Sequence, residues 1–290
     1  MTDPVIAVLG SINMDLVTTT RRRASPGETV FGTGFTTLPG GKGANQAIAA
    51  RRAGAEVEFV GAVGSDVFAD DLHRALTDAG VGTKQLRTVP GPSGVASIVV
   101  DGFGENSIIV VPGANGKLTD LGEDDLAVIA AADVLLCQYE IPAATILAAA
   151  RHARAHATVV VFNPSPVQAL PADLVANLDV VVVNSTEALA YGSALNPVPH
   201  LVITRGGSGA TWFGPREAEL TVPAFPVDVV DTTGAGDSFA GALAATWHLG
   251  PATALQWASA AGALATTNLG ATAAIPERPA IQALLRDHGL

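Results

Sequence analysis

The sequence has a single cysteine, Cys137, which excludes a disulfide within the chain. A chain without disulfides suits a reducing compartment, and we expect the protein in the cytoplasm. Cys137 lies in the apolar stretch DVLLCQYE, so we interpret it as a buried structural thiol rather than a nucleophile.

Basic residues are also few. There are 16 Lys and Arg against 27 Asp and Glu, which gives a formal net charge of −11. Because nucleic acids are bound through clustered positive charge, this balance argues against a nucleic-acid partner. It leaves ATP open as a ligand, since binding ATP requires only a few local donors.

The N-terminus, MTDPVIAVLGSINMD, lacks the basic start and the long apolar run of a signal peptide, so we expect none. Residues 252–275 contain no charged residue and are long enough to span a bilayer. They consist largely of small residues, however, whose transfer into lipid is only weakly favourable. We interpret this segment as a core helix followed by a loop, and we expect no membrane partner.

Apolar runs of strand length alternate along the chain with stretches of helical periodicity. The predicted buried strands are 5–10, 57–64, 133–137, 158–162, 179–183 and 201–204. Nearly continuous apolar strands separated by helices indicate a parallel sheet that is covered on both faces. We therefore predict an α/β fold with a doubly wound, mostly parallel sheet flanked by helices, in a single domain over residues 1–290.

Two regions, about 14–38 and 94–112, break this alternation. Both read as strands joined by turns, without helices between them. The second is predicted to be a hairpin with its turn around 102–106. We expect these strands to form a small separate β-sheet, a lid over one end of the main sheet.

The loop DTTGAGDSF is a glycine turn that runs into a helix. Glycine lets the backbone approach a ligand closely, and a helix start attracts anions. Gly234, Ala235 and Gly236 are therefore candidates for an anion hole that holds phosphate oxygens. Asp237 would repel an anion, so it is a candidate catalytic base that accepts the proton of a substrate hydroxyl. From spacing alone, an ordinary acid in the first turn of a helix explains Asp237 equally well.

A second glycine turn, LPGGKGANQAIAA, also precedes a helix and carries Gly41, Lys42 and Asn45. It lacks the spacing of a Walker P-loop. Lys42, Asn45 and the backbone amides could bind hydroxyl groups, but taken alone this signal is weak.

Three further polar groups follow predicted strands, where open parallel sheets bind ligands. Asn13 and Asp15 in GSINMDL suit a polyol, and a turn built on Asn and Asp explains them equally well. Glu140 in CQYE closes a buried strand and requires a polar partner. Asn184 and Glu187 in NSTE could reach a hydrated Mg²⁺, and their spacing also fits a helix capping box.

Together these motifs resemble those of the ribokinase-like carbohydrate kinases, the phosphofructokinase-B superfamily, and they are nearest in pattern to the ribokinases. The most specific feature is GGKGAN followed much later by DTTGAGDSF. The resemblance extends from the first strand to about Pro276. It implies transfer of the γ-phosphoryl group of Mg-ATP to the 5-hydroxyl of D-ribose, and a homodimer formed through the lid.

The resemblance also implies roles for individual residues. It makes Asp237 the catalytic base and Gly234, Ala235 and Gly236 the anion hole. It assigns sugar binding to Asn13, Asp15, Gly41, Lys42, Asn45, Ala96, Glu140 and Asp237. It assigns nucleotide binding to Asn184, Thr204, Gly206 and Gly209, with Asn184 and Glu187 holding Mg²⁺ indirectly.

Family members bind an activating K⁺, which the resemblance places near Asp231, Thr233, Ala265 and Gly270. Where they commonly carry a serine ligand, this chain has Ala274, so activation by K⁺ does not follow from the resemblance. The arginine run 21–23 is a second departure, and it could face an anionic sugar.

Two other functions are open at this point. The first is a kinase of the same superfamily that acts on another sugar or on a nucleoside. A nucleoside needs a stacking surface, however, and the predicted lid offers few aromatics: Phe31, Phe35 and Phe103. The second is a non-catalytic sugar-binding regulator, against which an intact Asp237 and anion hole argue.

Overall fold

The structure is a computed structural model, and it describes residues 3–215 and 218–290. Its main sheet has nine strands. Their order across the sheet is β13 (Glu219–Val222), β12 (Ala210–Phe213), β11 (His200–Thr204), β10 (Val180–Asn184), β9 (Val159–Asn163), β8 (Val134–Gln138), β1 (Val5–Leu9), β4 (Glu56–Val63) and β5 (Gly82–Thr88).

The strand directions confirm the predicted fold class. All pairs from β11 to β5 are parallel, and only β12 and β13 run antiparallel at one edge. The six predicted buried strands are β1, β4, β8, β9, β10 and β11. The sequence patterns did not indicate β5, β12 or β13, which lie toward the two edges of the sheet.

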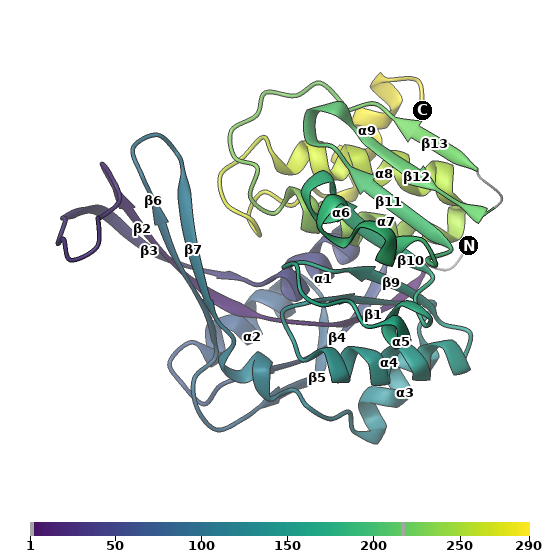
Figure 1. Cartoon of the computed structure of the whole chain (residues 1–290), viewed down its shortest axis with the longest axis horizontal. Coiled ribbons are helices and arrows are strands. Elements are labelled where there is room, and N and C mark those ends of the chain that lie inside the picture. Colours follow the sequence, from purple (N-terminus) through teal and green to yellow (C-terminus); the bar gives the residue numbers. More distant parts are fainter. Residues whose placement is uncertain (1–2, 216–217) are drawn as a thin grey trace.

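Helices cover both faces of the main sheet (Figure 1). They are α1 (Lys42–Ala53), α2 (Ala69–Asp78), α3 (Glu123–Ala131), α4 (Ala143–Ala155), α5 (Ala172–Val175), α6 (Ser185–Tyr191), α7 (Ala235–Thr246), α8 (Pro251–Ala265) and α9 (Arg278–Asp287). Side chains alternate along β1, because successive residues of a strand point to opposite faces. Ile6 and Val8 pack in the core with α1, α2, α7, α8 and α9, whereas Ala7 and Leu9 pack in the core with α3, α4 and α5.

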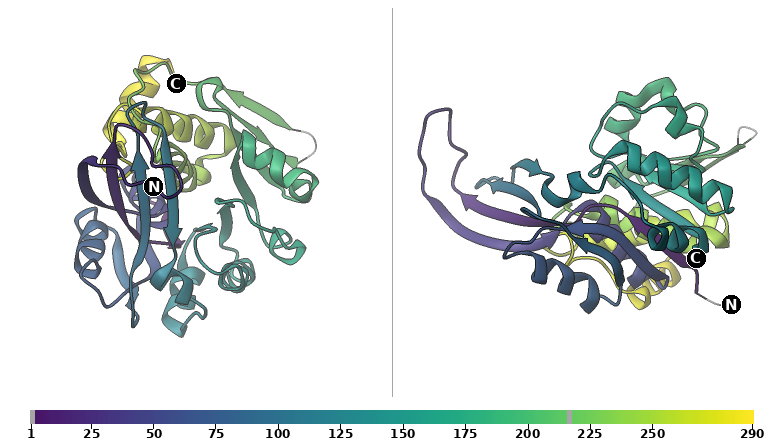
Figure 2. Two further views of the ribbon diagram at one scale, coloured as in Figure 1. Left: turned by 60° about the vertical axis from the view of Figure 1, so that its left-hand side comes forward. Right: turned by 90° about the horizontal axis from the view of Figure 1, so that it is seen from below.

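A second sheet of four strands lies apart from the main one. Its order is β3 (Gly32–Gly40), β2 (Asn13–Thr20), β6 (Gly94–Val100) and β7 (Asn106–Val111). These strands coincide with the two regions predicted to form a small sheet. Figure 2 shows β2 and β3 extending far beyond the body of the molecule, and every residue of β7 is exposed. The small sheet therefore contacts the rest of the chain mainly at its base.

Two expectations about apolar segments are confirmed. Residues 252–275 form most of α8 and the turns that follow it. Cys137 is fully buried in β8, and burial raises the pKa of its thiol. Within the described ranges, no helix has the length and apolar character needed to cross a membrane.

Candidate active site

The polar groups gather where the carboxyl ends of β1 and β8 lie side by side. These two strands are neighbours, but the chain adds β4 and β5 on one side of β1 before it returns to place β8 on the other. Such a reversal of strand order opens a crevice at the carboxyl ends of the strands, because the two loops leave in opposite directions. The site is therefore at the position that the fold makes available for a ligand.

Glu140, just after β8, joins three segments in this crevice. Its Oε2 accepts hydrogen bonds from the Ser11 hydroxyl at 2.5 Å and from the backbone N–H of Lys42 at 3.1 Å. Asn13 Nδ2 approaches the same oxygen at 3.5 Å. The polar partners that the sequence required for Glu140 are thus supplied by the loop after β1 and by the start of α1.

Asn13 and Asp15 are the first and third residues of β2, at the base of the small sheet. Asn13 is 2 % exposed and its side chain is held by Asn115, whose Nδ2 donates to Asn13 Oδ1 at 2.7 Å. Ala96 on β6 is directly paired with Asp15 in the sheet register. The predicted sugar-binding residues of the small sheet therefore lie together.

Asp15 is unusual in its charge state. Burial, together with the negative charges of Glu140 and Asp237, raises the pKa of its carboxyl from 3.8 to about 7. A carboxyl group that ionises near neutral pH can donate a hydrogen bond as well as accept one. This behaviour is typical of functional sites, where like charges are held close together.

Lys42, the first residue of α1, balances these carboxylates. Burial lowers the pKa of its amine, but Asp237, Glu140 and Glu187 together raise it above its ordinary value. The amine is therefore charged, and it lies within electrostatic reach of all three acids. Gly41 caps this helix with φ of 91°, and a Cβ there would lie 2.8 Å from the Asn13 nitrogen. Only glycine allows the two segments to approach so closely.

Asp237 lies in the first turn of α7 and is 7 % exposed. Its Oδ2 accepts from Asn45 Nδ2 at 3.1 Å, and its Oδ1 accepts from Gln46 Nε2 at 2.9 Å. An acid that merely favours a helix start would be solvated. Burial with two side-chain donors shows instead that the fold holds this carboxylate in one position.

The turn before Asp237 is open on its outer side. Gly234 has φ of 77°, and a Cβ there would lie 2.8 Å from Ala271 Cα, so a side chain does not fit. A Cβ on Gly236 would meet no atom within 4 Å among the described residues. The Ala235 N–H makes a long bond of 3.3 Å to Thr232 O. At Gly236, the start of α7 therefore leaves open space next to Asp237.

A cavity of about 380 Å³ adjoins this turn. It is lined by all four residues predicted to bind nucleotide, Asn184, Thr204, Gly206 and Gly209, and by Ala235 and Gly236 of the predicted anion hole. Its other walls are mainly apolar, with Phe225, Val227 and Val229 on one side and Ala263 of α8 on another. The size and the mostly apolar lining suit a small organic ligand.

Asn184 and Glu187 form the capping box that their spacing also fitted. Asn184 Oδ1 accepts from Glu187 N–H, and Glu187 Oε2 accepts from Asn184 N–H, both at 2.9 Å. This leaves the second carboxylate oxygen of Glu187 outside the capping box. The pair has three side-chain oxygens, two of which accept hydrogen bonds within the capping box. Within the described ranges, no cluster of three or more His, Cys, Asp or Glu is placed to hold a metal ion.

The residues predicted around a monovalent cation are linked by Asp231. Its Oδ1 accepts from the N–H and the hydroxyl of Thr233, at 2.9 and 2.7 Å, and its Oδ2 accepts from Gly270 N–H at 2.9 Å. Burial raises the pKa of this carboxyl, but the hydrogen bonds outweigh burial, and the pKa lies below its ordinary value. Ala265 ends α8 nearby, and Ala274 is buried without a side-chain oxygen to offer.

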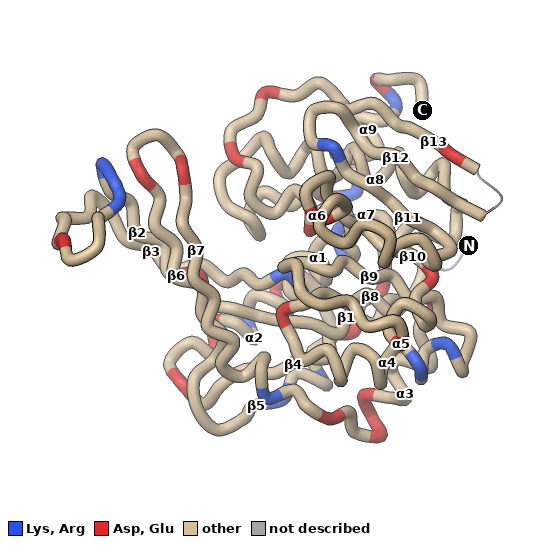
Figure 3. Tube along the Cα trace, in the orientation of Figure 1, with Lys and Arg blue, Asp and Glu red and all other residues tan. Residues whose placement is uncertain are grey.

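The arginine run does not face this site. Arg22 pairs with Glu28, and Arg23 pairs with Asp101 at 3.0 Å, within the far end of the small sheet. Figure 3 shows basic and acidic positions interspersed at that end. The ion pairs of Arg22 and Arg23 join the loops at the tip and argue against a role of these two residues in binding an anionic sugar.

Residues 3–278 of this chain match the family model of the pfkB carbohydrate kinases. The chain belongs to this family and is a carbohydrate kinase of the ribokinase type, as the motifs predicted. It is 38 % identical to the ribokinase of Bacillus subtilis (strain 168), with 97 % of this chain and 99 % of the relative covered.

Two other comparisons extend this result. The deoxyribokinase of Salmonella typhi is 35 % identical over 82 % of this chain and 84 % of its own length. Among solved structures, Arabidopsis thaliana ribokinase complexed with ribose and ATP superposes with a TM-score of 0.91 at 30 % identity, and 99 % of each chain is covered.

Several residues of the site were not predicted from the sequence. They are Ser11, Gln46, Asn115, Gln138, Asn163 and Thr272. Four of them form a side-chain hydrogen bond with a predicted residue. The other two, Gln138 and Asn163, form hydrogen bonds with Gln46. Ser11, Gln46 and Gln138 lie inside the quoted motifs, which was the available signal. The partners of the others are far away in sequence, so no local pattern indicates them.

Proposed function

We propose that the protein transfers the γ-phosphoryl group of ATP to the 5-hydroxyl of D-ribose. The observation that carries this proposal is the position of Asp237. Its charge acts on Asp15 and Lys42 in the polar crevice, while its neighbour Gly236 lines the cavity. A hydroxyl bound in the crevice and a phosphate at the end of the cavity would meet beside one carboxylate.

The polar crevice supports a sugar as the acceptor. Asn13, Asp15, Asn45 and Glu140 offer side-chain acceptors and donors, and Lys42 adds a charged donor. A polyol requires this mixture of groups, because every hydroxyl both donates and accepts. Ala96, which pairs with Asp15, adds only a methyl group, and Gly41 lets the start of α1 approach Asn13 closely.

Asp237 would accept the proton of the attacking hydroxyl as the oxygen bonds to phosphorus and the bond to the β-phosphate breaks. Phosphoryl transfer depends mainly on alignment and on charge stabilisation, so the residues around Asp237 have little covalent chemistry to perform. The N–H groups of Gly234, Ala235 and Gly236 would stabilise the negative oxygens of the transferred group, with Lys42 nearby.

The nucleotide would occupy the cavity, with Thr204, Gly206 and Gly209 along one wall. Asn184 and Glu187 fit a hydrated Mg²⁺ rather than a fully protein-bound ion, because the capping box leaves few oxygens free and Mg²⁺ keeps several waters. Held there, the ion would supply neutralisation of charge on the phosphates.

The small sheet would act as a lid that excludes water from the reacting groups. Its outer strand also suggests a second copy of this chain as partner. Residues 108–111 of β7 are all exposed and all apolar, and a long exposed apolar edge strand is normally covered. We therefore propose a homodimer through this sheet, within a chain that otherwise forms a single domain.

ADP release tests the proposal most directly. The acceptors are ribose, deoxyribose, fructose, fructose 6-phosphate, 2-keto-3-deoxygluconate, adenosine and pseudouridine, each with Mg-ATP. We expect selective turnover of ribose. Turnover of another acceptor would keep the mechanism and change the substrate, whereas ribose binding without turnover would support a sugar-binding regulator.

A nucleoside acceptor is less well supported by the aromatic residues. Phe31 and Phe103 are 97 % and 90 % exposed and lie in the loops at the far end of the small sheet, whereas Asp15 lies near its base. They offer no stacking surface beside the crevice.

The variant Asp237→Asn tests the assignment of the base. We expect kcat to fall by roughly 10³-fold or more, while the Kd for ribose measured by calorimetry changes little, because an amide still fills the position but cannot accept the proton. Near-normal turnover in this variant would mean that another group accepts the proton.

A further inference from the structure

Asp237 receives hydrogen bonds from two consecutive residues of α1, but these residues differ in what else they can reach. Asn45 is one of the proposed sugar-binding residues. Gln46 is 0 % exposed, and its side chain contacts only protein groups. Gln46 is thus enclosed by protein groups, whereas Asn45 lies beside the crevice.

Gln46 belongs to a chain of buried carboxamides. Its Nε2 donates to Asp237 Oδ1 at 2.9 Å and to Asn163 Oδ1 at 3.1 Å. Its Oε1 accepts from Gln138 Nε2 at 2.8 Å. Asn163 in turn donates through Nδ2 to the carbonyl of Val182 at 2.9 Å. Every member of this network is at most 9 % exposed.

The direction of these hydrogen bonds is fixed by groups that cannot donate. The Val182 carbonyl only accepts, so Asn163 must turn its amide nitrogen to it and its oxygen to Gln46. Both Asp237 oxygens act as acceptors here, so Gln46 turns its nitrogen toward Asp237 and Asn163. Gln46 Oε1 then faces Gln138, which must donate.

This direction leaves Gln138 Oε1 without a hydrogen-bond partner among the described residues. It lies against Gly10, where a Cβ would be only 2.0 Å away. A buried polar atom without a hydrogen-bond partner costs free energy. The orientation of Gln138 is therefore not the one that would satisfy its own oxygen. It is set by the need to donate to Gln46.

We propose that Gln46 is a positioning residue that holds Asp237 for proton transfer, and that Gln138 keeps the Gln46 carboxamide from turning over. If the amide turned over, its oxygen would face the carboxylate and repel it. This inference rests on the proposed function, in which Asp237 is the base, and it concerns residues that do not touch the substrates.

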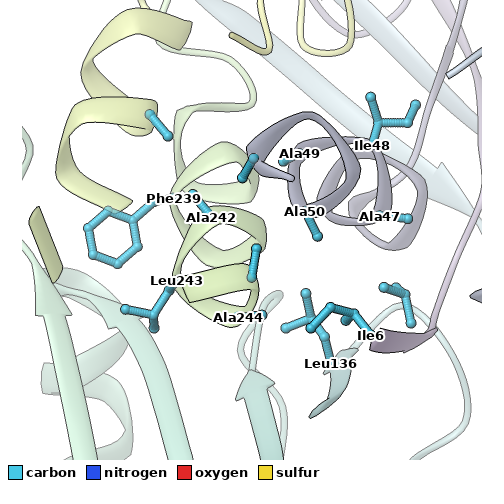
Figure 4. Close-up of a cluster of buried hydrophobic side chains, with 14 of the residues drawn as sticks. Ile6, Ala47, Ile48, Ala49, Ala50, Leu136, Phe239, Ala242, Leu243 and Ala244 are labelled. Atoms are coloured by element: carbon cyan, nitrogen blue, oxygen red, sulfur yellow. The ribbon is translucent and has the colours of Figure 1, made fainter. Parts of the chain in front are cut away.

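The packing of α1 against α7 keeps this arrangement rigid. Figure 4 shows Ala49 of α1 on the side of that helix toward α7, whose labelled residues include the small Ala242 and Ala244. Such small residues allow the two helix backbones to approach closely, so Gln46 has little freedom to move away from the start of α7.

Gly241, one turn after Asp237, marks a close approach of α1 and α7. A Cβ there would lie 2.5 Å from the Gln46 carbonyl oxygen. The backbone that carries Gln46 is therefore pressed against the helix that carries Asp237.

Three variants test the inference by steady-state kinetics of the full chain. Gln46→Met keeps the volume but removes the donor, and we expect kcat to fall about 10- to 100-fold, the usual effect of losing a hydrogen bond to a charged group. KM for sugar and for ATP should stay within about twofold, since neither substrate touches residue 46. Gln85→Met on β5, away from the crevice, is the matched control and should leave both constants unchanged.

The comparison at position 138 separates positioning from simple packing. Glu is nearly the same shape as Gln but cannot donate once it is ionised, so in Gln138→Glu assayed at alkaline pH the Gln46 amide would turn its nitrogen to the new carboxylate and its oxygen to Asp237. We expect this variant to lose more kcat than Gln138→Met, which leaves the amide free to keep its bond with Asp237. Urea unfolding of each variant shows whether a loss of activity follows a loss of folding.

The possible outcomes are distinct. A wild-type kcat retained in Gln46→Met, or a loss that appears in KM instead of kcat, overturns the inference while Asp237→Asn still supports the base. Equal effects of Glu and Met at position 138 overturn the directing role of Gln138. If the wild-type chain turns over no acceptor, or if Asp237→Asn is fully active, the proposed function fails and this inference fails with it.

Discussion

Replacing Asp15 by asparagine should stabilise the protein at alkaline pH while it weakens the site. In the folded chain, the pKa of Asp15 is raised from 3.8 to about 7 by burial and by the charges of Glu140 and Asp237. The native state therefore holds more protons than the unfolded state between these two pH values. The free energy of unfolding must fall as pH rises through this window, and the loss is complete above about pH 7.

The size of the effect follows from the shift. Each pKa unit corresponds to about 1.4 kcal/mol, so a shift from 3.8 to about 7 amounts to at most about 4 kcal/mol. Of this, about 2 kcal/mol falls between pH 5.5 and pH 8.5, since only the part of the window above pH 5.5 is sampled. Asparagine has the same shape and no charge, so Asp15→Asn should lack this component.

The assay is urea unfolding of the wild type and of Asp15→Asn at pH 5.5 and at pH 8.5. The wild type should lose about 2 kcal/mol more than the variant over this interval. Asp78→Asn, an exposed carboxylate at the end of α2, is the control and should follow the wild type. Identical pH dependence in the wild type and in Asp15→Asn would refute the idea that Asp15 is a strained acid. The same variant should raise KM for the sugar, which would make Asp15 a case of stability given up for binding.

Two further predictions concern packing and the cation. Gly241→Ala should destabilise the fold by about 1–3 kcal/mol and lower kcat. The reason is that the new Cβ would lie 2.5 Å from the Gln46 carbonyl oxygen and 2.6 Å from Ala49 Cβ. An unchanged urea midpoint would contradict the tight approach of α1 and α7. The wild type should respond weakly to K⁺, whereas Ala274→Ser, which supplies the missing hydroxyl, should respond more strongly; ADP release measured in KCl and in choline chloride compares them, and a strong wild-type response would show that the serine oxygen is dispensable.

The core of the fold could be predicted because its strands carry a signal of their own. β1, β8, β9 and β10 are short, almost wholly apolar and bounded by helical patterns, which is the pattern of a parallel strand buried on both faces. β5 reads GTKQLRT, with only one buried residue, and β13 is four residues long with one. Edge strands bury too little to leave a clear period, so they depend on neighbours that a sequence pattern does not reveal.

The same distinction applies to the site. The glycine turns could be recognised because the chemistry requires particular residues at close spacing, and the structure places them around one crevice. Gln46 and Asp237 are separated by 191 positions, and Gln46 and Gln138 by 92. A hydrogen bond over such distances is created by the fold alone. Glu187 shows a third case, because its capping role and its proposed metal role use different atoms of one side chain, and spacing could not separate them.

The attachment of β2 to the body has a mechanical consequence. Asn13 and Asp15 lie at the start of this strand, whereas its outer end at Thr20 is seven residues from the base. If the small sheet rotates about Asn13, the displacement of each residue grows with its distance from Asn13. Asp15 is two residues away and Thr20 is seven, so Asp15 moves by only roughly two-sevenths as far as Thr20. The tip could therefore open wide enough to admit a sugar while the hydroxyl-binding groups near the fulcrum stay almost in place, so the acceptor would meet a preassembled half-site before the sheet closes.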